Sequence, residues 1–485
     1  MAQPTEHRMV QTRHAEQRLW HTHWRTLVTM AALGALYGIV VTLPTPAGLS
    51  PQGQKVLGVA VVAIGLWSTA ALPMGVTSML VVLLLVLSGG VSGFREALGG
   101  FAEPVTYFLM AVLTLGLAVL RSGLAERVAR FFLRRCAGRP RALYVHLLLS
   151  FPLLTLLLPS ATTRTGILIH VYDQALELSD VPRGAPLAKA IMLALNSVNR
   201  LASTMLLTGG ITPVVSAALI GGMSWSRWLV LMSVPYGVLL ALAAGLIYCL
   251  HRHCFSMPLA TVLVTDPVPF SGIERRTAII TLGAALLWLS DALHHWHPAI
   301  PALLAWVCLL APRLGVLTWS DFERHLGWAN VFVLASSLSL AQALMHSGAG
   351  AWMAALLVHS TPALTQHPPL LIVALLLATA PVRLLIPNIT GFLALTIPLA
   401  MSIGQAAGLN PMICGLVVMI AGDAVLYYPA QSASSLVVYE RGHLTAPEIF
   451  RFGVWMALVA YVVVLAVALP YWTMVGEPLR LSTGP

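Results

Sequence analysis

The chain has 485 residues, of which 58% are apolar and 9% are charged, and it carries a formal net charge of +10. This composition excludes a soluble globular protein, because so few charged residues cannot cover the surface of a domain this large. It predicts an all-α polytopic membrane protein. We interpret the positive charge as an orientation signal of membrane loops, and we expect no binding to nucleic acid.

The N-terminal segment is polar and lacks the apolar core and small-residue cleavage site of a signal peptide. We therefore expect residues 1–26 to form a cytoplasmic N-terminal segment. The apolar runs that follow are long enough to cross ~30 Å of hydrocarbon and predict about eleven transmembrane helices. The predicted spans lie at 27–43, 56–72, 76–89, 105–120, 187–221, 228–250, 277–293, 299–315, 330–346, 411–439 and 452–475.

The distribution of basic residues predicts the orientation of these spans. If the N-terminus is cytoplasmic, the alternation of spans places the loop 121–141, with its seven arginines, on the same side. The loops expected outside, at 44–55, 222–227 and 294–299, carry two basic residues between them. This asymmetry follows the positive-inside rule and predicts a multi-pass protein of the cell inner membrane with a cytoplasmic N-terminus.

Two further apolar stretches, 143–178 and 369–405, are interrupted by short polar segments at a proline. These read LLLPSATTRTG at 156–166 and LLIPNITGFLA at 384–394. Because lipid offers no partners to backbone amides, such breaks occur only where protein or a water-filled cavity surrounds them. We predict two re-entrant hairpins, and paired breaks of this kind indicate the binding site of a secondary transporter built from inverted repeats.

An internal repeat supports this interpretation. Residues 101–132 align without a gap with 326–357 and share seven identities, including Ser122 with Ser347 and Gly123 with Gly348. The polar breaks recur at a similar offset, so we expect a first half at 27–276 and an inverted second half at 277–485. Each hairpin is followed by an interrupted apolar segment, NSVNRLASTMLLTGGITP at 196–213 and AGDAVLYYPAQSASS at 421–435. The hairpin tips and these breaks are expected to meet near the middle of the bilayer.

With these features the chain resembles the divalent anion:sodium symporter family of di- and tricarboxylate and sulfate carriers. The resemblance covers about residues 56 to 475, through LWSTAALPMGVTSMLVVLLL at 66–85, the GF-x-x-P block at 100–104, both hairpins and YYPAQSASSLVVYERGHLTAPEIFRFGVW at 427–455. It implies a homodimer in membrane lipid, in which each subunit has a scaffold and a transport domain that moves as an elevator.

The family places a Ser-Asn-Thr motif at each hairpin tip, where it binds substrate and lies beside the sodium sites. Here the matching residues are Ser160, Ala161 and Thr162 in the first hairpin and Asn388, Ile389 and Thr390 in the second. Both tips keep the threonine and replace the central asparagine by an apolar residue. The free amides at the start of each half-helix suit an anion, and ordinary N-capping is the alternative reading of the polar residues.

Charged residues inside apolar segments are the other candidates, because each costs about 2.5–3.5 kcal/mol unless it faces a cavity or a partner. Arg164 would pair with the anion, stand in for a sodium ion, or extend to cytoplasmic water. Arg200 would bind the anion or form a structural pair with Asp173 or Asp423. Arg383 would bind the anion or cap the preceding helix. Asp423 would act as a proton carrier, an arginine partner or a cation ligand.

The sequence thus predicts one polar site with two sets of residues. The candidate substrate-binding residues are Ser160, Ala161, Thr162, Arg164, Asn199, Arg200, Asn388, Ile389, Thr390 and Gln431. The candidate coupling residues are Asp423, Arg383, Asn196 and Ser197. The five cysteines show no metal-ligand spacing, so we expect no metal site and no cofactor, with Na⁺ as a candidate coupling ion.

We therefore expect a secondary active transporter of small divalent anions, with C4-dicarboxylates favoured and anion exchange as a candidate mode. Two alternatives stay open: a sodium-coupled citrate or sulfate symporter, and a cation or oxyanion permease of the sodium:proton or arsenite type. An enzyme is not expected, because the sequence shows no nucleophile–base pair and no cluster of His and Asp at helical spacing.

Overall fold

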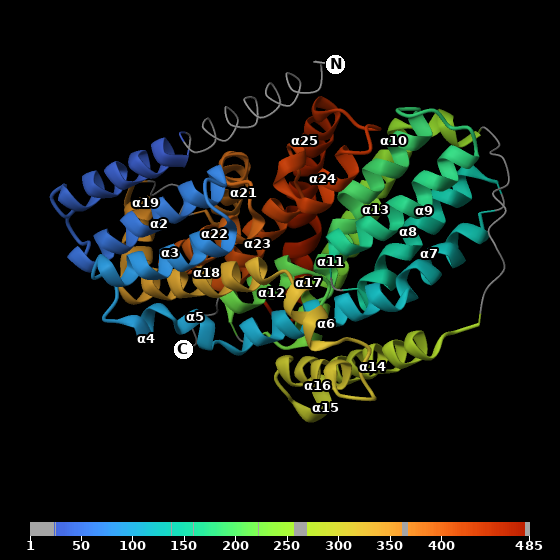
Figure 1. The fold of residues 1–485 in the computed structure, drawn as a ribbon. Helices are drawn as coiled ribbons and strands as arrows, with labels where there is room; N and C mark the ends of the chain where they lie inside the picture. The colour runs from blue at the N-terminus through green and yellow to red at the C-terminus, as the bar shows by residue number, and fades with distance from the viewer. Residues whose placement is uncertain are drawn as a thin grey trace, which may run out of the picture.

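The computed structural model describes Trp24 and residues 26–136, 138–158, 160–221, 223–256, 269–360 and 367–480, so most of the predicted segment 1–26 lies outside the described residues. The described chain is a bundle of helices (Figure 1). Seven helices are long and apolar enough to cross a membrane, and shorter apolar helices accompany them. The predicted all-α polytopic membrane fold is confirmed.

The first half contains a helix at Thr26–Thr42 and the elements that follow it. These are α2 (Pro51–Thr69), α3 (Met74–Leu87), α4 (Phe94–Ala97), α5 (Gly99–Ala102), α6 (Pro104–Ser122), α7 (Leu124–Arg134), α8 (Pro140–Leu157), α9 (Ala161–Leu178), α10 (Pro186–Leu193), a π turn (Ala194–Val198), α11 (Asn199–Met205), α12 (Ile211–Ile220), α13 (Trp225–Leu250) and a 3₁₀ turn (Arg252–Ser256).

The second half has a similar order of elements. Its elements are α14 (Gly272–Leu289), α15 (Asp291–His294), α16 (Ala299–Leu310), α17 (Trp319–His325), α18 (Trp328–His346), α19 (Ala349–Ser360), α21 (Pro368–Leu385), α22 (Ile389–Ala406), α23 (Pro411–Asp423), a 3₁₀ turn (Pro429–Gln431), α24 (Ala433–Tyr439), α25 (Ala446–Val463), a π turn (Val464–Ala468) and α26 (Leu469–Met474).

The helix bounds recur between the halves. Both helices of the first hairpin, α8 and α9, return 228 residues later as α21 and α22, with the same lengths of 18 residues. The aligned glycines close equivalent helices, because Gly123 after α6 and Gly348 after α18 have φ of 79° and 73°. This left-handed conformation favours glycine, which explains why that identity persists among apolar neighbours.

Each hairpin is followed by a broken helix. In the first half the helix runs from α10 through the π turn into α11, stops at Met205 and resumes as α12 at Ile211. In the second half α23 stops at Asp423 and α24 starts at Ala433. The predicted spans 187–221 and 411–439 are therefore discontinuous helices. The predicted span 299–315 ends earlier, at Leu310, because Pro312 follows and cannot continue the helix.

The two halves interlock by crossed contacts. Helix α3 of the first half packs against α18 of the second, and α6 packs against α16. Around the breaks, α9 packs against α24 and α22 packs against α12. In Figure 1 these breaks lie in the centre of the bundle, where the green and red segments meet. Each broken helix is thus completed by contacts from the opposite half.

Candidate anion-binding site

The tip of the first hairpin is capped by its own side chains. The Oγ of Ser160 accepts a hydrogen bond from the Thr163 backbone N–H at 3.3 Å, so Ser160 caps α9. Ala161 is half-buried and Thr162 is exposed. The first residues of α9 are thus partly exposed at the tip. The buried polar contacts of this hairpin are made one turn further along α9.

Arg164 makes those contacts from a fully buried position, with an exposed fraction of 0%. Its Nε donates to the Asn199 side-chain oxygen at 3.0 Å, and its Nη2 donates to the Asn199 carbonyl at 3.2 Å and to the Ser203 hydroxyl. Its Nη1 donates to the carbonyls of Leu158 and Gly209. Arg164 therefore does not extend to water, and all its partners in the described chain are neutral oxygens.

The second hairpin tip has a similar arrangement. The Oδ1 of Asn388 accepts hydrogen bonds from the amides of Thr390 (2.8 Å) and Gly391 (3.3 Å), so it caps α22. Ile389 is half-buried and Thr390 is buried. Arg383, with an exposed fraction of 1%, lies in the last turn before the break.

The Arg383 guanidinium also binds backbone carbonyls. Its Nη1 donates to the carbonyls of Ile386 at 2.7 Å and Pro387 at 2.6 Å, and its Nε donates to the Gly422 carbonyl at 3.3 Å. It thus joins the hairpin break to the end of α23. The first two bonds are the helix-capping contact that the sequence offered as an alternative.

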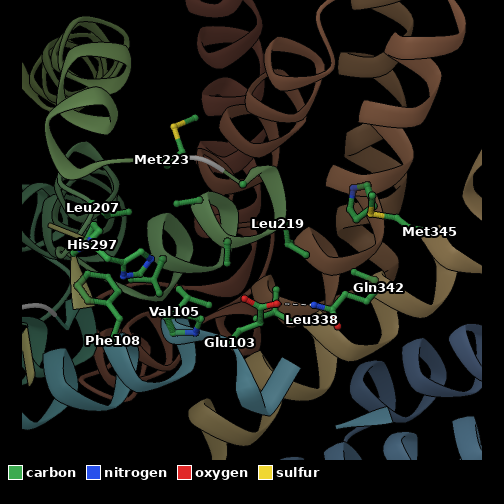
Figure 2. A pocket seen from close by; sticks show the side chains of 18 residues that line it. Glu103, Val105, Phe108, Leu207, Leu219, Met223, His297, Leu338, Gln342 and Met345 are labelled. Atoms are coloured by element: carbon green, nitrogen blue, oxygen red, sulfur yellow. Dashed lines mark hydrogen bonds between the residues drawn. The ribbon is translucent and has the colours of Figure 1, made fainter. Parts of the chain in front are cut away.

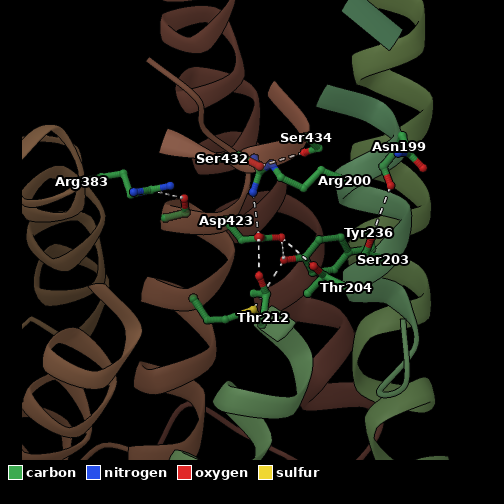
Figure 3. Close-up of polar contacts among 12 residues, drawn as sticks. Asn199, Arg200, Ser203, Thr204, Thr212, Tyr236, Arg383, Asp423, Ser432 and Ser434 are labelled. Atoms are coloured by element: carbon green, nitrogen blue, oxygen red, sulfur yellow. Dashed lines mark hydrogen bonds and ion pairs between the residues drawn. The ribbon is translucent and has the colours of Figure 1, made fainter. Parts of the chain in front are cut away.

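A buried ion pair lies between the two hairpins (Figure 3). Arg200 Nη1 donates to Asp423 Oδ1 at 2.8 Å, with side-chain exposures of 9% and 0%. The Asp423 carboxylate also accepts hydrogen bonds from the hydroxyls of Thr204 (2.7 Å), Thr212 (3.1 Å) and Tyr236 (3.1 Å). In this structure Asp423 is an arginine partner, as one of the sequence alternatives has it, and Asp173 instead pairs with His443.

These contacts form one polar network that runs from tip to tip. Arg164 binds Asn199, the neighbour of Arg200 in α11, and Arg383 binds Gly422, the neighbour of Asp423 in α23. The Arg200–Asp423 pair joins the two sides. Through this network, residues beside the two hairpin tips contact the two broken helices, as the sequence predicts.

Several buried polar atoms in this region have no partner in the described chain. They are Arg200 Nε and Nη2, Asn196 Oδ1 and Ser435 Oγ. Asn196 belongs to the π turn, which α24 contacts, and Ser435 belongs to α24. Buried donors without a partner are rare because each loses about 1–3 kcal/mol of solvation. Two N–H groups of one guanidinium are thus available to a ligand oxygen.

The charge of the network is positive. Arg200 and Asp423 cancel, whereas Arg164 and Arg383 have no carboxylate partner among the residues that the structure describes. Arginine does not lose its proton in proteins, so both charges persist. The buried region therefore carries two positive charges and matches a doubly charged anion.

The remaining predicted residues hold the surrounding backbone. Gln431 accepts from the Tyr427 amide at 2.6 Å and donates to the Arg383 carbonyl at 2.7 Å, so its side chain fixes the second break. Ser197 accepts a hydrogen bond from Asn196 at 3.2 Å. Asn199 contacts the first hairpin as well, because its Nδ2 donates to Thr165 Oγ1 at 2.8 Å.

Sequence reasoning missed four hydroxyl residues of the network: Ser203, Thr204, Thr212 and Tyr236. Ser203 and Thr204 lie one turn after Asn199 and Arg200, so helical spacing could have indicated them. Tyr236 lies in the middle of the apolar helix α13, and its sequence context gives no signal that its hydroxyl reaches Asp423.

A separate cavity of about 260 Å³ lies between α6, α12, α18 and α22, beside the loop that holds His297 (Figure 2). Its lining is mostly apolar, and Glu103 accepts a hydrogen bond from Gln342 at 2.8 Å within it. His297 also lines it, and burial lowers the pKa of this histidine from its ordinary value. None of the described lining residues is Lys or Arg, so the arginine network, rather than this cavity, is the candidate site for an anion.

Comparisons with known proteins match this chain to a family profile and to named relatives. The family profile described as "Sodium:sulfate symporter transmembrane region" matches residues 21–477. A protein of Cupriavidus necator named "Membrane protein" is 23% identical, with 94% of this chain and 93% of the relative covered. The "Putative malate transporter YflS" of Bacillus subtilis is 25% identical over 67% of this chain and 71% of its own.

A plant protein and a solved structure extend the comparison. "Dicarboxylate transporter 2, chloroplastic" of Spinacia oleracea is 23% identical over 93% of this chain and 82% of its own. The crystal structure of the Alcanivorax borkumensis YdaH transporter superposes with a TM-score of 0.53 at 16% identity, covering 79% of this chain and 88% of that one. The structural likeness concerns the fold alone.

Proposed function

Because the chain belongs to the sodium:sulfate symporter transmembrane family, we propose that it is a secondary transporter that exchanges C4-dicarboxylate dianions, such as succinate or malate, across the membrane. The names of two relatives, a putative malate transporter and a dicarboxylate transporter, support the dicarboxylate class. The elevator motion, the homodimer, the inner-membrane location and the cytoplasmic N-terminus belong to the same proposal and rest on the resemblance and on the loop charges.

The observation that carries the proposal is the pair of unpartnered N–H groups on Arg200. Asp423 accepts a hydrogen bond from Nη1, and Nε and Nη2 have no partner among the residues that the structure describes. Nε and one Nη present the parallel donors that bind a carboxylate in two-point fashion. We propose that one carboxylate of the substrate binds there, with the buried hydroxyl of Ser435 and the side chain of Asn196 beside it.

The charge balance supports exchange rather than one-way symport. A dianion neutralises the two positive charges of Arg164 and Arg383, so the loaded site is close to neutral. An empty site keeps both charges, and moving them through the low-dielectric centre of the membrane is expensive. The empty transport domain is therefore expected to return slowly, and a second anion on the other side restores a fast return.

Asp423 is proposed to orient Arg200 rather than to carry protons. Its two oxygens already accept four hydrogen bonds, from one guanidinium and three hydroxyls. Protonation would place a proton on an oxygen that has donors on every side. Proton-linked transport through Asp423 is thus an outcome that the experiment below distinguishes.

The test is uptake of labelled succinate into proteoliposomes that contain the full chain. Uptake is compared with and without internal unlabelled succinate, at zero and saturating sodium, and with and without a pH gradient. We expect uptake to require internal dianion and to be insensitive to sodium and to the pH gradient. Strict sodium dependence without internal anion, or uptake driven by a pH gradient into empty vesicles, would refute exchange.

A further inference from the structure

The two carbonyl-bound arginines reach corresponding places in the two halves by different routes. Arg164 follows its hairpin break and Arg383 precedes its own, yet the two guanidinium groups donate to corresponding carbonyls of the two breaks. Leu158 and Ile386, which supply those carbonyls, are 228 residues apart, the offset that relates the two hairpins. The sequence repeat therefore does not align these two arginines with each other. Their guanidinium groups nevertheless make corresponding contacts.

Each half has two positions from which an arginine could reach this carbonyl, one on each side of the hairpin break. Each half has an arginine at one of the two positions. The offset of 228 places Thr155 opposite Arg383 and Phe392 opposite Arg164. Both non-arginine partners face a glycine at the helix break. An added Cβ on Gly209 would lie 2.7 Å from Thr155 Cγ2, and one on Gly422 would lie 2.0 Å from a Phe392 ring carbon. All four positions thus lie where a hairpin packs against a broken helix.

Backbone carbonyl oxygens surround the guanidinium group in both halves. In the first half Arg164 binds the carbonyls of Leu158, Asn199 and Gly209. In the second half Arg383 binds the carbonyls of Ile386 and Pro387 at the hairpin break and of Gly422 near the end of α23. Carbonyl oxygens that converge in the absence of a carboxylate are the environment of a bound cation. Here a guanidinium fills that environment and is covalently part of the chain.

We infer that Arg164 and Arg383 are two internal cations that occupy equivalent positions, each clamping a hairpin break to its broken helix in place of a bound metal ion. This inference rests on the proposed function only in reading the site as an anion site, and it identifies which residues make sodium unnecessary. The positive charge that a coupling cation would bring and remove with each cycle is permanent in this protein.

The equivalence can be tested by moving one arginine to the corresponding position on the other side of its hairpin break. Arg383→Thr copies Thr155 and removes the second internal cation. The double variant Arg383→Thr/Phe392→Arg adds an arginine at the position that corresponds to Arg164. Its guanidinium is expected to reach the same carbonyls from the other side of the hairpin break. We expect Arg383→Thr to lower succinate exchange at least about tenfold, the factor that 1.4 kcal/mol produces, and to lower the melting temperature in detergent. The double variant is expected to recover most of both losses.

Phe392→Arg alone is the matched control, because it adds a third buried guanidinium that lacks a carboxylate partner and removes none, so it is expected to lower the melting temperature. A double variant no more stable and no more active than Arg383→Thr would overturn the equivalence of the two positions.

A second measurement does not depend on transport. Without any dicarboxylate, sodium chloride should leave the melting temperature of the wild-type protein at its value in choline chloride. Arg383→Ala opens a gap lined by carbonyls, so millimolar guanidinium or sodium should raise its melting temperature more than that of wild type. A wild-type protein stabilised by sodium, or an Arg383→Ala protein that responds to neither cation, would overturn the inference. Because no dicarboxylate is present, this result is decided even if the wild type fails to exchange dicarboxylates.

Discussion

Arg200 has two roles, an ion pair with Asp423 and the proposed contact with the ligand. Replacing Arg200 by lysine separates these roles, because lysine can form the ion pair but not the two-point contact. The lysine ammonium keeps the positive charge and can reach Asp423, which Arg200 Nη1 contacts at 2.8 Å. It lacks the planar fork that presents Nε and Nη2, the two groups without a partner. Arg200→Lys should therefore impair ligand binding while it preserves the fold.

The size of the effect follows from the number of lost donors. A hydrogen bond to a charged group contributes about 1.5–3 kcal/mol, so the loss of two such bonds to a carboxylate amounts to about 3–6 kcal/mol. Because each 1.4 kcal/mol changes an equilibrium constant tenfold, we expect the dissociation constant for succinate to rise about 100-fold or more. The ion pair persists, so the melting temperature should change little.

The assay is titration of succinate into the purified protein, followed by exchange in proteoliposomes at rising external succinate. Arg127→Lys is the matched control. Arg127 forms a two-point pair with Glu274, with both N–O distances at 2.9 Å, and lies on α7 outside the network. It loses the same fork without touching the proposed site. Wild-type affinity in Arg200→Lys, or an equal loss in Arg127→Lys, would refute the assignment of Arg200.

Two further changes test the surroundings of the ion pair. Asp423→Asn leaves the Arg200 guanidinium buried without its carboxylate, so we expect a loss of about 3–5 kcal/mol of stability, seen as a lower melting temperature; an unchanged melting temperature would contradict it. Gly422→Ala drives a Cβ to within 2.0 Å of the buried Phe392 ring and should cost about 1–3 kcal/mol. Gly166→Ala, with nothing within 4 Å of the added Cβ, should be tolerated, and equal melting temperatures of the two alanine variants would argue against this packing.

The hairpins could be predicted from the sequence because a polar break in an apolar segment has few physical solutions in a membrane. The capping residues in 156–166 and 384–394 set where each second helix begins, because α9 and α22 start at Ala161 and Ile389, directly after the caps Ser160 and Asn388. The same logic predicted the discontinuous helices, because glycine, proline and polar residues interrupt both segments.

The partners of the charged residues could not be predicted in the same way. Arg164 was expected at an anion, at a sodium position or at water, and its ring of neutral oxygens depends on where α11 and its break lie in space. Arg200 and Asp423 are 223 residues apart, and nothing in either local sequence selects one arginine for that carboxylate. Tyr236 completes the set from a third helix. Such contacts are fixed by tertiary packing, which local patterns do not encode.

The crossed contacts of α9 with α24 and of α12 with α22 also constrain how the chain is made. The ribosome delivers α9 and α12 before α22 and α24, and the chain between Ile220 and Ile389 must be synthesised first. At about 5–20 residues per second, the wait is roughly 10 to 30 s. During that time Arg200 is in the membrane without Asp423, and the break at 206–210 has no cover from the second half. A ribosome that stops after α13 therefore releases a half-protein whose polar helix break at 206–210 lacks the contacts that α22 makes with α12 in the complete chain.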